Sequence, residues 1–187
     1  MTTTTAATSV AAPRTAACAA AVGCGLLVLR PLLLQTSAPA TPLLIALFAA
    51  LLAVGGLWPN ADGGQHQRVA ATLAIGIIAF AAARVLGGGH APHTAVPRLV
   101  VLNTLAAIAE EAFFRRFVYR LLEPNGATLA VVGSATLFAL VHITVYGAWV
   151  LPIDLGAGLL LSWQRWASGS WRVPAVTHVL ANILVVI

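Results

Sequence analysis

Residues 99–122 of the chain read LVVLNTLAAIAEEAFFRRFVYRLL, an apolar run with two adjacent glutamates near its middle. A run of this length can span the ~30 Å hydrocarbon core of a bilayer as one helix. An ionised side chain at that depth costs at least ~2.5 kcal/mol on insertion scales, so acids there usually serve a function. Glu110 and Glu111 are therefore the first candidates for a functional site.

The composition of the whole chain agrees with a membrane location. Of its 187 residues 60% are hydrophobic and 8% are charged, which leaves too few polar groups to cover a soluble globule of this size. The ten basic residues are all arginines and are scattered along the sequence, a distribution that excludes a nucleic-acid-binding surface. Cys18 and Cys24 lie in one apolar run and form neither a disulfide framework nor a zinc-type spacing. The chain is predicted to be a polytopic membrane protein in contact with lipid.

Six further apolar runs accompany the first, and segments rich in glycine, proline or asparagine separate them. Each run is short enough to cross a bilayer once. We predict an all-α, integral membrane helix bundle of about seven transmembrane helices. It forms a single domain over residues 16–187, preceded by a disordered leader at residues 1–15. The predicted spans are residues 16–34, 42–58, 69–86, 99–122, 128–145, 149–163 and 173–187.

The arginines predict the orientation of the bundle. With the N-terminus in the cytoplasm, seven of the ten arginines fall at cytoplasmic helix ends, and only Arg30, Arg84 and Arg98 fall on the other side. Cytoplasmic segments of membrane proteins carry an excess of arginine and lysine. The N-terminus is therefore expected in the cytoplasm and the C-terminus outside.

The two glutamates are expected to differ in their partners. Glu111 and Arg115 are four residues apart with the acid first, the spacing at which helical side chains meet and neutralise each other. Glu110 points about 100° away and lacks that partner, so its carboxylate is available as a general base or acid. The alternative is a buried network, in which both glutamates pair with Arg115 and Arg116 and only hold helices together. These residues alone leave both readings open.

Two histidines fall inside other predicted spans. His142 ends the run SATLFALVH, and His178 begins the run HVLAN. Histidine can donate, accept or shuttle a proton near neutral pH. Asn182 follows His178 by four residues and shares its helix face. The alternative for each histidine is a simple hydrogen bond between helices.

The depths of these residues in their spans differ. At 1.5 Å per residue, Glu110 lies ~18 Å and His142 ~22 Å from the nearest cytoplasmic helix end, whereas His178 lies only ~10 Å from its own. The three side chains can meet only if the last span starts deeper in the membrane or if the helices tilt.

Three short motifs now stand in order on separate predicted spans. Glu110-Glu111-Ala-Phe-Phe-Arg115 matches EExxxR, Phe138-Ala-Leu-Val-His142 matches FxxxH, and His178-Val-Leu-Ala-Asn182 matches HxxxN. Over residues 98–187 the chain resembles the CAAX protease and bacteriocin-processing (CPBP, or Abi) family of intramembrane proteases, which are similar to type II CAAX prenyl endopeptidases. The resemblance implies a multi-pass protein of the cytoplasmic membrane of a bacterial-type cell. It also implies hydrolysis of a peptide bond in a membrane-associated protein or peptide, with or without a lipid group.

The resemblance also implies a role for each motif residue. Glu110 and His142 would activate water, and His178 and Asn182 would stabilise the tetrahedral oxyanion. Glu111, paired with Arg115, would hold the helix and help to orient Glu110. The favoured mechanism needs no metal. The alternative is a zinc ion held by Glu110, His142 and His178, a ligand set used by catalytic zinc elsewhere, although the HExxH motif is absent.

Two other classes of function remain open. The first is a member of the same fold that has become a non-catalytic immunity or scaffolding protein. The second is a small proton-coupled transporter that uses Glu110 and the histidines as a relay. Transporters often contain inverted repeats with broken helices, and no internal repeat is visible in this sequence.

Overall fold

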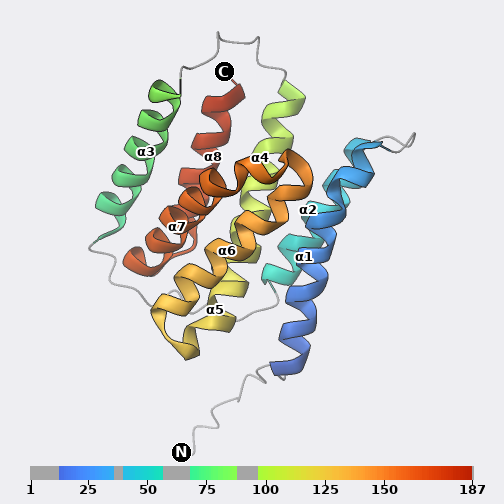
Figure 1. Cartoon of the computed structure of the whole chain (residues 1–187), viewed down its shortest axis with the longest axis horizontal. Helices are drawn as coiled ribbons and strands as arrows, with labels where there is room; N and C mark the ends of the chain where they lie inside the picture. The colour runs from blue at the N-terminus through green and yellow to red at the C-terminus, as the bar shows by residue number, and fades with distance from the viewer. Residues whose placement is uncertain (1–12, 36–39, 57–67, 88–96, 187) are drawn as a thin grey trace, which may run out of the picture.

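The computed structural model describes residues 13–35, 40–56, 68–87 and 97–186, and these residues form helices and turns but no strand. Seven helices of 15 to 23 residues pack into one bundle (Figure 1). They are α1 (Pro13–Gln35), α2 (Ala40–Gly56), α3 (Val69–Leu86), α4 (Pro97–Glu111), α6 (Ala127–Tyr146), α7 (Leu151–Ser168) and α8 (Arg172–Val186). The all-α prediction is confirmed for the described part of the chain.

Shorter elements connect two of these helices to their successors. The π-helix η2 (Ala112–Val118), the helix α5 (Tyr119–Leu122) and the 3-10 helix η3 (Glu123–Asn125) continue α4, so that one rod covers the predicted span at residues 99–122. The 3-10 helix η4 (Ala148–Val150) leads into α7. The predicted boundaries agree with the structure to within a few residues, except that α7 continues to Ser168 before Gly169, with φ of 70°, ends it.

The predicted leader falls mostly outside the described residues. Helix α1 begins at Pro13, so residues 13–15 are helical, and residues 1–12 are not described.

Among the described residues, three helices are long and apolar enough to cross a membrane: Arg14–Leu33 of α1, and all of α3 and α6. Helix α2 is apolar but shorter. Helices α4, α7 and α8 carry the polar residues discussed below, and these lower the apolar character of the segments. These apolar helices indicate a membrane protein. The number of helices that cross the membrane stays a prediction.

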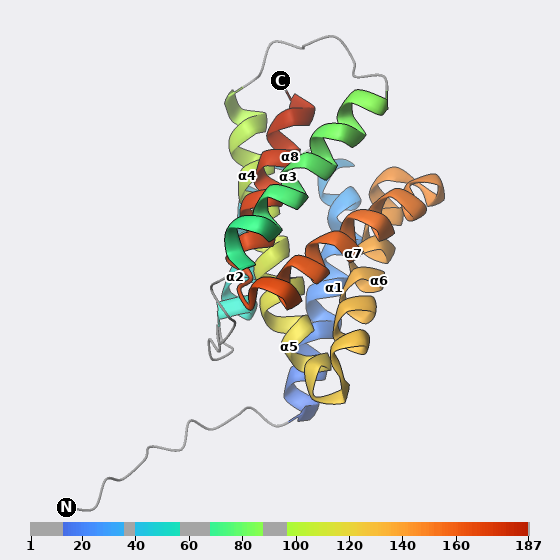
Figure 2. The same ribbon diagram turned by 90° about the vertical axis from the view of Figure 1, so that its left-hand side faces the viewer.

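Helices α1 and α8 run in the same direction along the bundle. Helix α1 starts and α8 ends at opposite ends of the bundle, and α4 lies beside α8 in both views (Figures 1 and 2). Helix α7 crosses the bundle obliquely, and its turn into α8 lies well above the lower ends of α5 and α6. The last helix therefore starts deep in the bundle, which removes the mismatch in depth between His178 and the other site residues.

A polar cap stabilises that deep turn. Ser168, which is 1% exposed, donates a hydrogen bond from Oγ to the carbonyl of Gln164 and accepts one from the backbone N–H of Ser170. Gly169 occupies the left-handed region and donates its N–H to the carbonyl of Arg165. Buried backbone groups need such partners, so this turn can lie away from the membrane surface.

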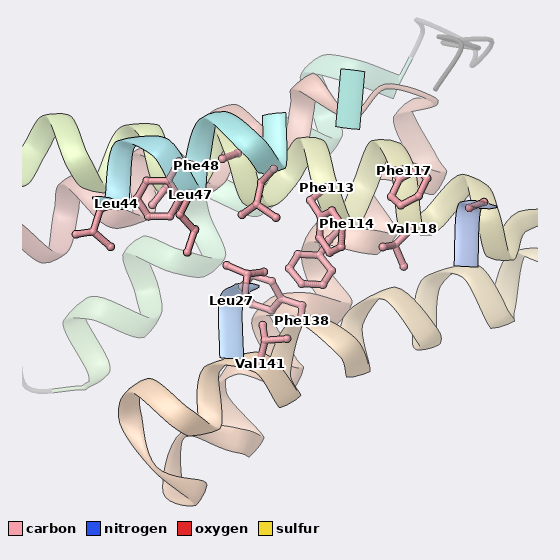
Figure 3. Packing of buried hydrophobic residues seen from close by; sticks show 14 residues of the cluster. Leu27, Leu44, Leu47, Phe48, Phe113, Phe114, Phe117, Val118, Phe138 and Val141 are labelled. Atoms are coloured by element: carbon pink, nitrogen blue, oxygen red, sulfur yellow. The ribbon is translucent and has the colours of Figure 1, made fainter. Parts of the chain in front are cut away.

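The apolar core joins α1 and α2 to the π-helix and α6. The labelled side chains of Figure 3 include three phenylalanines of the π-helix and Phe138 of α6. Phe113 and Phe114 meet edge to face at 4.9 Å, and Phe114 meets Phe138 in the same way at 5.5 Å. Helix α2 comes close because Gly55 has no side chain: a Cβ there would lie 2.7 Å from the carbonyl oxygen of Ala112. The core thereby fixes the segment that follows the two glutamates.

Candidate active site

The two glutamates end α4 at the point where the rod widens into the π-helix. In this segment the N–H of Tyr119 bonds to the carbonyl of Phe114, five residues earlier. Two of its carbonyls also accept hydrogen bonds from other helices: Ser134 Oγ of α6 donates to Phe114 at 2.9 Å, and Arg165 Nε of α7 donates to Arg115 at 3.1 Å. Such wide turns within α-helices occur frequently at functional sites. Here neighbouring helices stabilise it.

The predicted pair of Glu111 and Arg115 is present. Arg115 Nη1 lies 3.1 Å from Glu111 Oε1, and both side chains are fully buried. Arg115 Nη2 donates to the carbonyl of Gly158 at 3.3 Å, and the guanidinium lies 4.5 Å from the centre of the Phe138 ring. The pair therefore joins the π-helix to α6 and α7.

Glu111 also binds a histidine, which the sequence did not predict. His178 Nδ1 lies 2.9 Å from Glu111 Oε1. An ionised carboxylate only accepts hydrogen bonds, so Nδ1 is the donor and Nε2 takes no part in this bond. Glu111 thus sets the orientation of His178 as well as neutralising Arg115.

Glu110 is buried and faces two groups on other helices. Its Oε1 lies 3.3 Å from Arg30 Nη1 of α1, and its Oε2 lies 3.8 Å from His142 Nε2 of α6. The i,i+4 spacing gave Glu110 no partner within its own helix; the structure supplies Arg30 from a helix 80 residues earlier, which helical spacing cannot place. Arg116, the other cation of the alternative network, donates instead to the carbonyl of Gly56.

His142 has its ring fixed by its own helix. Its Nδ1 lies 2.7 Å from the carbonyl oxygen of Phe138, and its ring stacks on Tyr146 with 6.0 Å between centroids. A carbonyl only accepts, so Nδ1 carries the hydrogen and Nε2 presents a lone pair toward Glu110. The 3.8 Å between Nε2 and Glu110 Oε2 is too long for a direct hydrogen bond and suits a bridging water. The two groups can therefore act on one water molecule.

Asn182 shares the α8 face of His178, as its spacing predicted. Its Nδ2 donates to the carbonyl of Asn103 on α4 at 3.2 Å. A side-chain amide has a second N–H, so Asn182 can still donate to another acceptor in the cavity.

These groups surround one cavity of about 550 Å³, bounded by α1, α3, α4, α6, α7 and α8. Four of the predicted site residues line it: Glu110, His142, His178 and Asn182. Glu111 and Arg115 are not among the lining residues and support the wall from behind. The remaining lining is mostly apolar and includes aromatic rings, as in most ligand sites.

Three charged residues of the cavity were not predicted as site residues. Asp154, in the first turn of α7, has Oδ2 3.9 Å from His142 Nδ1. Arg84 of α3 donates from Nε to the carbonyl of Leu184 at 3.0 Å, and Arg30 contacts Glu110. The sequence does mark all three as candidates, because each is an isolated charged residue in an apolar run.

The described residues contain no group of three His, Cys, Asp or Glu placed to hold a metal ion together. In the alternative zinc set, Glu110 and His142 face each other, while His178 Nδ1 is bound to Glu111. The need for a metal remains a prediction to be tested by experiment.

Comparison with known protein families gives one match. The model described as "Type II CAAX prenyl endopeptidase Rce1-like" matches residues 92–184, a segment that contains all three motifs. The family resemblance expected from those motifs is thereby confirmed. No curated protein and no solved structure matches the chain.

Proposed function

Residues 92–184 belong to the Rce1-like family of type II CAAX prenyl endopeptidases, and on that premise we propose that this protein is an intramembrane endopeptidase. Its reaction is hydrolysis of a peptide bond in a membrane-associated protein or peptide. The observation that carries the proposal is the position of Glu110 Oε2, 3.8 Å from His142 Nε2 in a cavity that His178 and Asn182 also line.

The first step of the reaction uses Glu110 and His142. A water molecule between Glu110 Oε2 and His142 Nε2 gives a proton to the carboxylate, and its oxygen attacks the carbonyl carbon of the scissile bond. The new C–O bond forms as the carbonyl electron pair moves to oxygen. The proton then passes from Glu110 to the amide nitrogen, the oxyanion's electron pair re-forms the carbonyl bond, and the C–N bond breaks. The products are a carboxylic acid and an amine; transfer of the acid's proton to the amine leaves a carboxylate and an ammonium, so no further reactant is needed.

The second part of the machinery stabilises the negative oxygen of the intermediate. His178 and Asn182 lie one turn apart on α8 and both line the cavity, and we assign Nε2 of His178 and the second N–H of Asn182 as the donors to the oxyanion. Since Nδ1 of His178 donates to Glu111, a second donation from Nε2 requires the ring to carry both protons. Donors held in advance around a developing oxyanion are commonly the largest electrostatic contribution to catalysis.

The proposed substrate reaches the cavity from a membrane. Exposed apolar side chains on the helices, such as Ile78 of α3 at 66%, give the protein a lipid-facing surface. The mostly apolar lining of the cavity suits a hydrophobic segment, with or without a lipid group, in contact with membrane lipid.

A comparison of membrane proteomes tests the function. Cells that express the wild-type protein should contain peptides with new C-termini that are missing from cells expressing Glu110→Gln. Glutamine keeps the size of the side chain but cannot take up the proton. Glu123→Gln is the matched control, since Glu123 pairs with Arg120 in the short segment after the π-helix, away from the cavity. Identical C-termini in all three strains would exclude the protease function.

Alanine variants of the proposed water-activating pair separate the enzyme from a scaffolding protein. If Glu110→Ala and His142→Ala accumulate in the membrane but abolish the cellular phenotype, the non-catalytic alternative fails. If both leave the phenotype intact, the enzyme fails.

Removal of metal tests the cofactor. We expect hydrolysis to continue after exhaustive treatment of the purified protein with a chelator, because the proposed base is a carboxylate acting directly on water. Peptide cleavage and bound metal would be measured on the same sample. Loss of cleavage that returns when zinc is added would favour the zinc site of Glu110, His142 and His178.

A further inference from the structure

We propose that Arg30 is a positioning residue of this active site, supplied by α1 from outside the segment that matches the family. Its guanidinium holds the Glu110 carboxylate so that one oxygen is fixed and the other faces His142. The inference rests on the proposed function and adds a residue to it.

The contacts of Arg30 place it in the cavity wall. Its side chain is 15% exposed, its Nη1 lies 3.3 Å from Glu110 Oε1, and it is one of the lining residues. The guanidinium also lies 5.5 Å from the centre of the Phe48 ring of α2. Its Nε is buried and makes no hydrogen bond to any described residue. A carboxylate on one side and an aromatic ring on the other thus define where the guanidinium lies.

The contact with Arg30 gives the two carboxylate oxygens of Glu110 different neighbours. Oε1 is held by Arg30, whereas Oε2 faces His142 Nε2 at 3.8 Å. A carboxylate at the end of a glutamate side chain can rotate, and rotation would exchange the two oxygens. With Oε1 held, Oε2 stays at the position where the water is activated.

The other charged groups near Glu110 do not perform this task. Arg115 is bound to Glu111, and His178 is bound to the same carboxylate. Asp154 of α7 is negative and lies beside His142 on the side of Nδ1. Arg30 lies in direct contact with Glu110, with 3.3 Å between Nη1 and Oε1.

A kinetic comparison of variants tests the positioning role. The substrate is a synthetic peptide that spans a cleavage site found in the proteome comparison, and the protein is the full chain in lipid. Because small misplacements of catalytic groups cost on the order of 100-fold in rate, Arg30→Gln should lower kcat by about that factor and change KM little. Arg30→Lys keeps the charge but loses the planar fork, and should recover about 10-fold of the loss. Arg14→Gln, an exposed arginine at the start of α1, is the matched control and should behave as wild type.

A double-mutant cycle in thermal stability tests the contact independently of activity. Arg30→Gln should lower the melting temperature in the wild type, and by clearly less in the Glu110→Gln background, because the two side chains interact. Where Arg30→Gln does not accumulate, Arg30→Lys takes its place in both experiments.

The positioning role of Arg30 would be contradicted by the following results. A wild-type kcat in Arg30→Gln, a change confined to KM, or an equal loss of melting temperature in both backgrounds would overturn it. Where only Arg30→Lys accumulates, a kcat equal to that of the wild type would also contradict the positioning role. A wild-type protein that cleaves nothing would overturn the proposed function instead, and the stability cycle would then still report whether Arg30 and Glu110 are coupled.

Discussion

Glu110 and Glu111 are neighbours in sequence, yet their carboxylates have different surroundings. Glu110 faces the cavity, where Arg30 and His142 contact it, and Glu111 lies at 0% exposure between Arg115 and His178. The cause is the rotation of about 100° per residue in a helix, which directs adjacent side chains to different neighbours. The same substitution at the two positions should therefore have different effects.

We expect Glu111→Gln to destabilise the protein far more than Glu110→Gln. Removing one partner of a fully buried ion pair leaves the other charge uncompensated, at a cost of about 3–5 kcal/mol. Arg115 would be left in that state, since its side chain is fully buried. Thermal unfolding of the purified variants in lipid measures the difference. Equal losses for the two variants would show that Glu111 has no special structural role.

The parts of the site that could be predicted are those set within one helix. The pair of Glu111 and Arg115 follows from a spacing of four residues. The contacts of Glu110 with Arg30 and of Glu111 with His178 join residues 80 and 67 positions apart, so they depend on how whole helices pack. Periodicity within a single segment carries no information about such packing.

At the scale of the elements, the helices were predictable and the π-helix was not. Apolar runs and the glycine and proline residues between them define α3 at Val69–Leu86, as predicted. The π-helix has the sequence AFFRRFV, which by itself would also suit an α-helix. What distinguishes it are the hydrogen bonds that Ser134 and Arg165 donate to its carbonyls from other helices.

Ser134→Ala tests whether those bonds stabilise the π-helix. The substitution removes the donor from α6 while the Tyr119 N–H still bonds to the Phe114 carbonyl, so the loss is that of one hydrogen bond, about 0.5–1.5 kcal/mol. Ser162→Ala is the matched control, because Ser162 is equally buried and its Oγ makes no hydrogen bond to any residue that the structure describes. Thermal unfolding of both variants gives the comparison. If Ser162→Ala costs as much as Ser134→Ala, the bond to Phe114 is not what stabilises this segment.

At the scale of the whole molecule, the helix directions bear on the orientation in the membrane. Helix α1 starts and α8 ends at opposite ends of the bundle (Figure 1). The predicted seven crossings, an odd number, would place these two ends on opposite sides of a membrane. The arginine distribution in the sequence predicts which end is cytoplasmic.

Reporter fusions test this orientation. A fluorescent protein joined before Met1 should fluoresce in a bacterial host, because it folds in the cytoplasm, and alkaline phosphatase joined after Ile187 should be active, because it needs the outer side. Exchanging the two reporters should abolish both signals. Activity of the same reporter at both ends would mean an even number of crossings and would contradict the seven-span arrangement.

The distribution of the site over the chain also determines when it can exist during synthesis. Arg30 lies on α1, and His178 and Asn182 lie on α8, with the glutamates and His142 between them in the sequence. During synthesis Arg30 therefore leaves the ribosome before the glutamates, and α8 leaves it after the other helices that line the cavity. Under the proposed mechanism, a nascent chain without α8 has no oxyanion donors, so it should be unable to cleave its neighbours in the membrane.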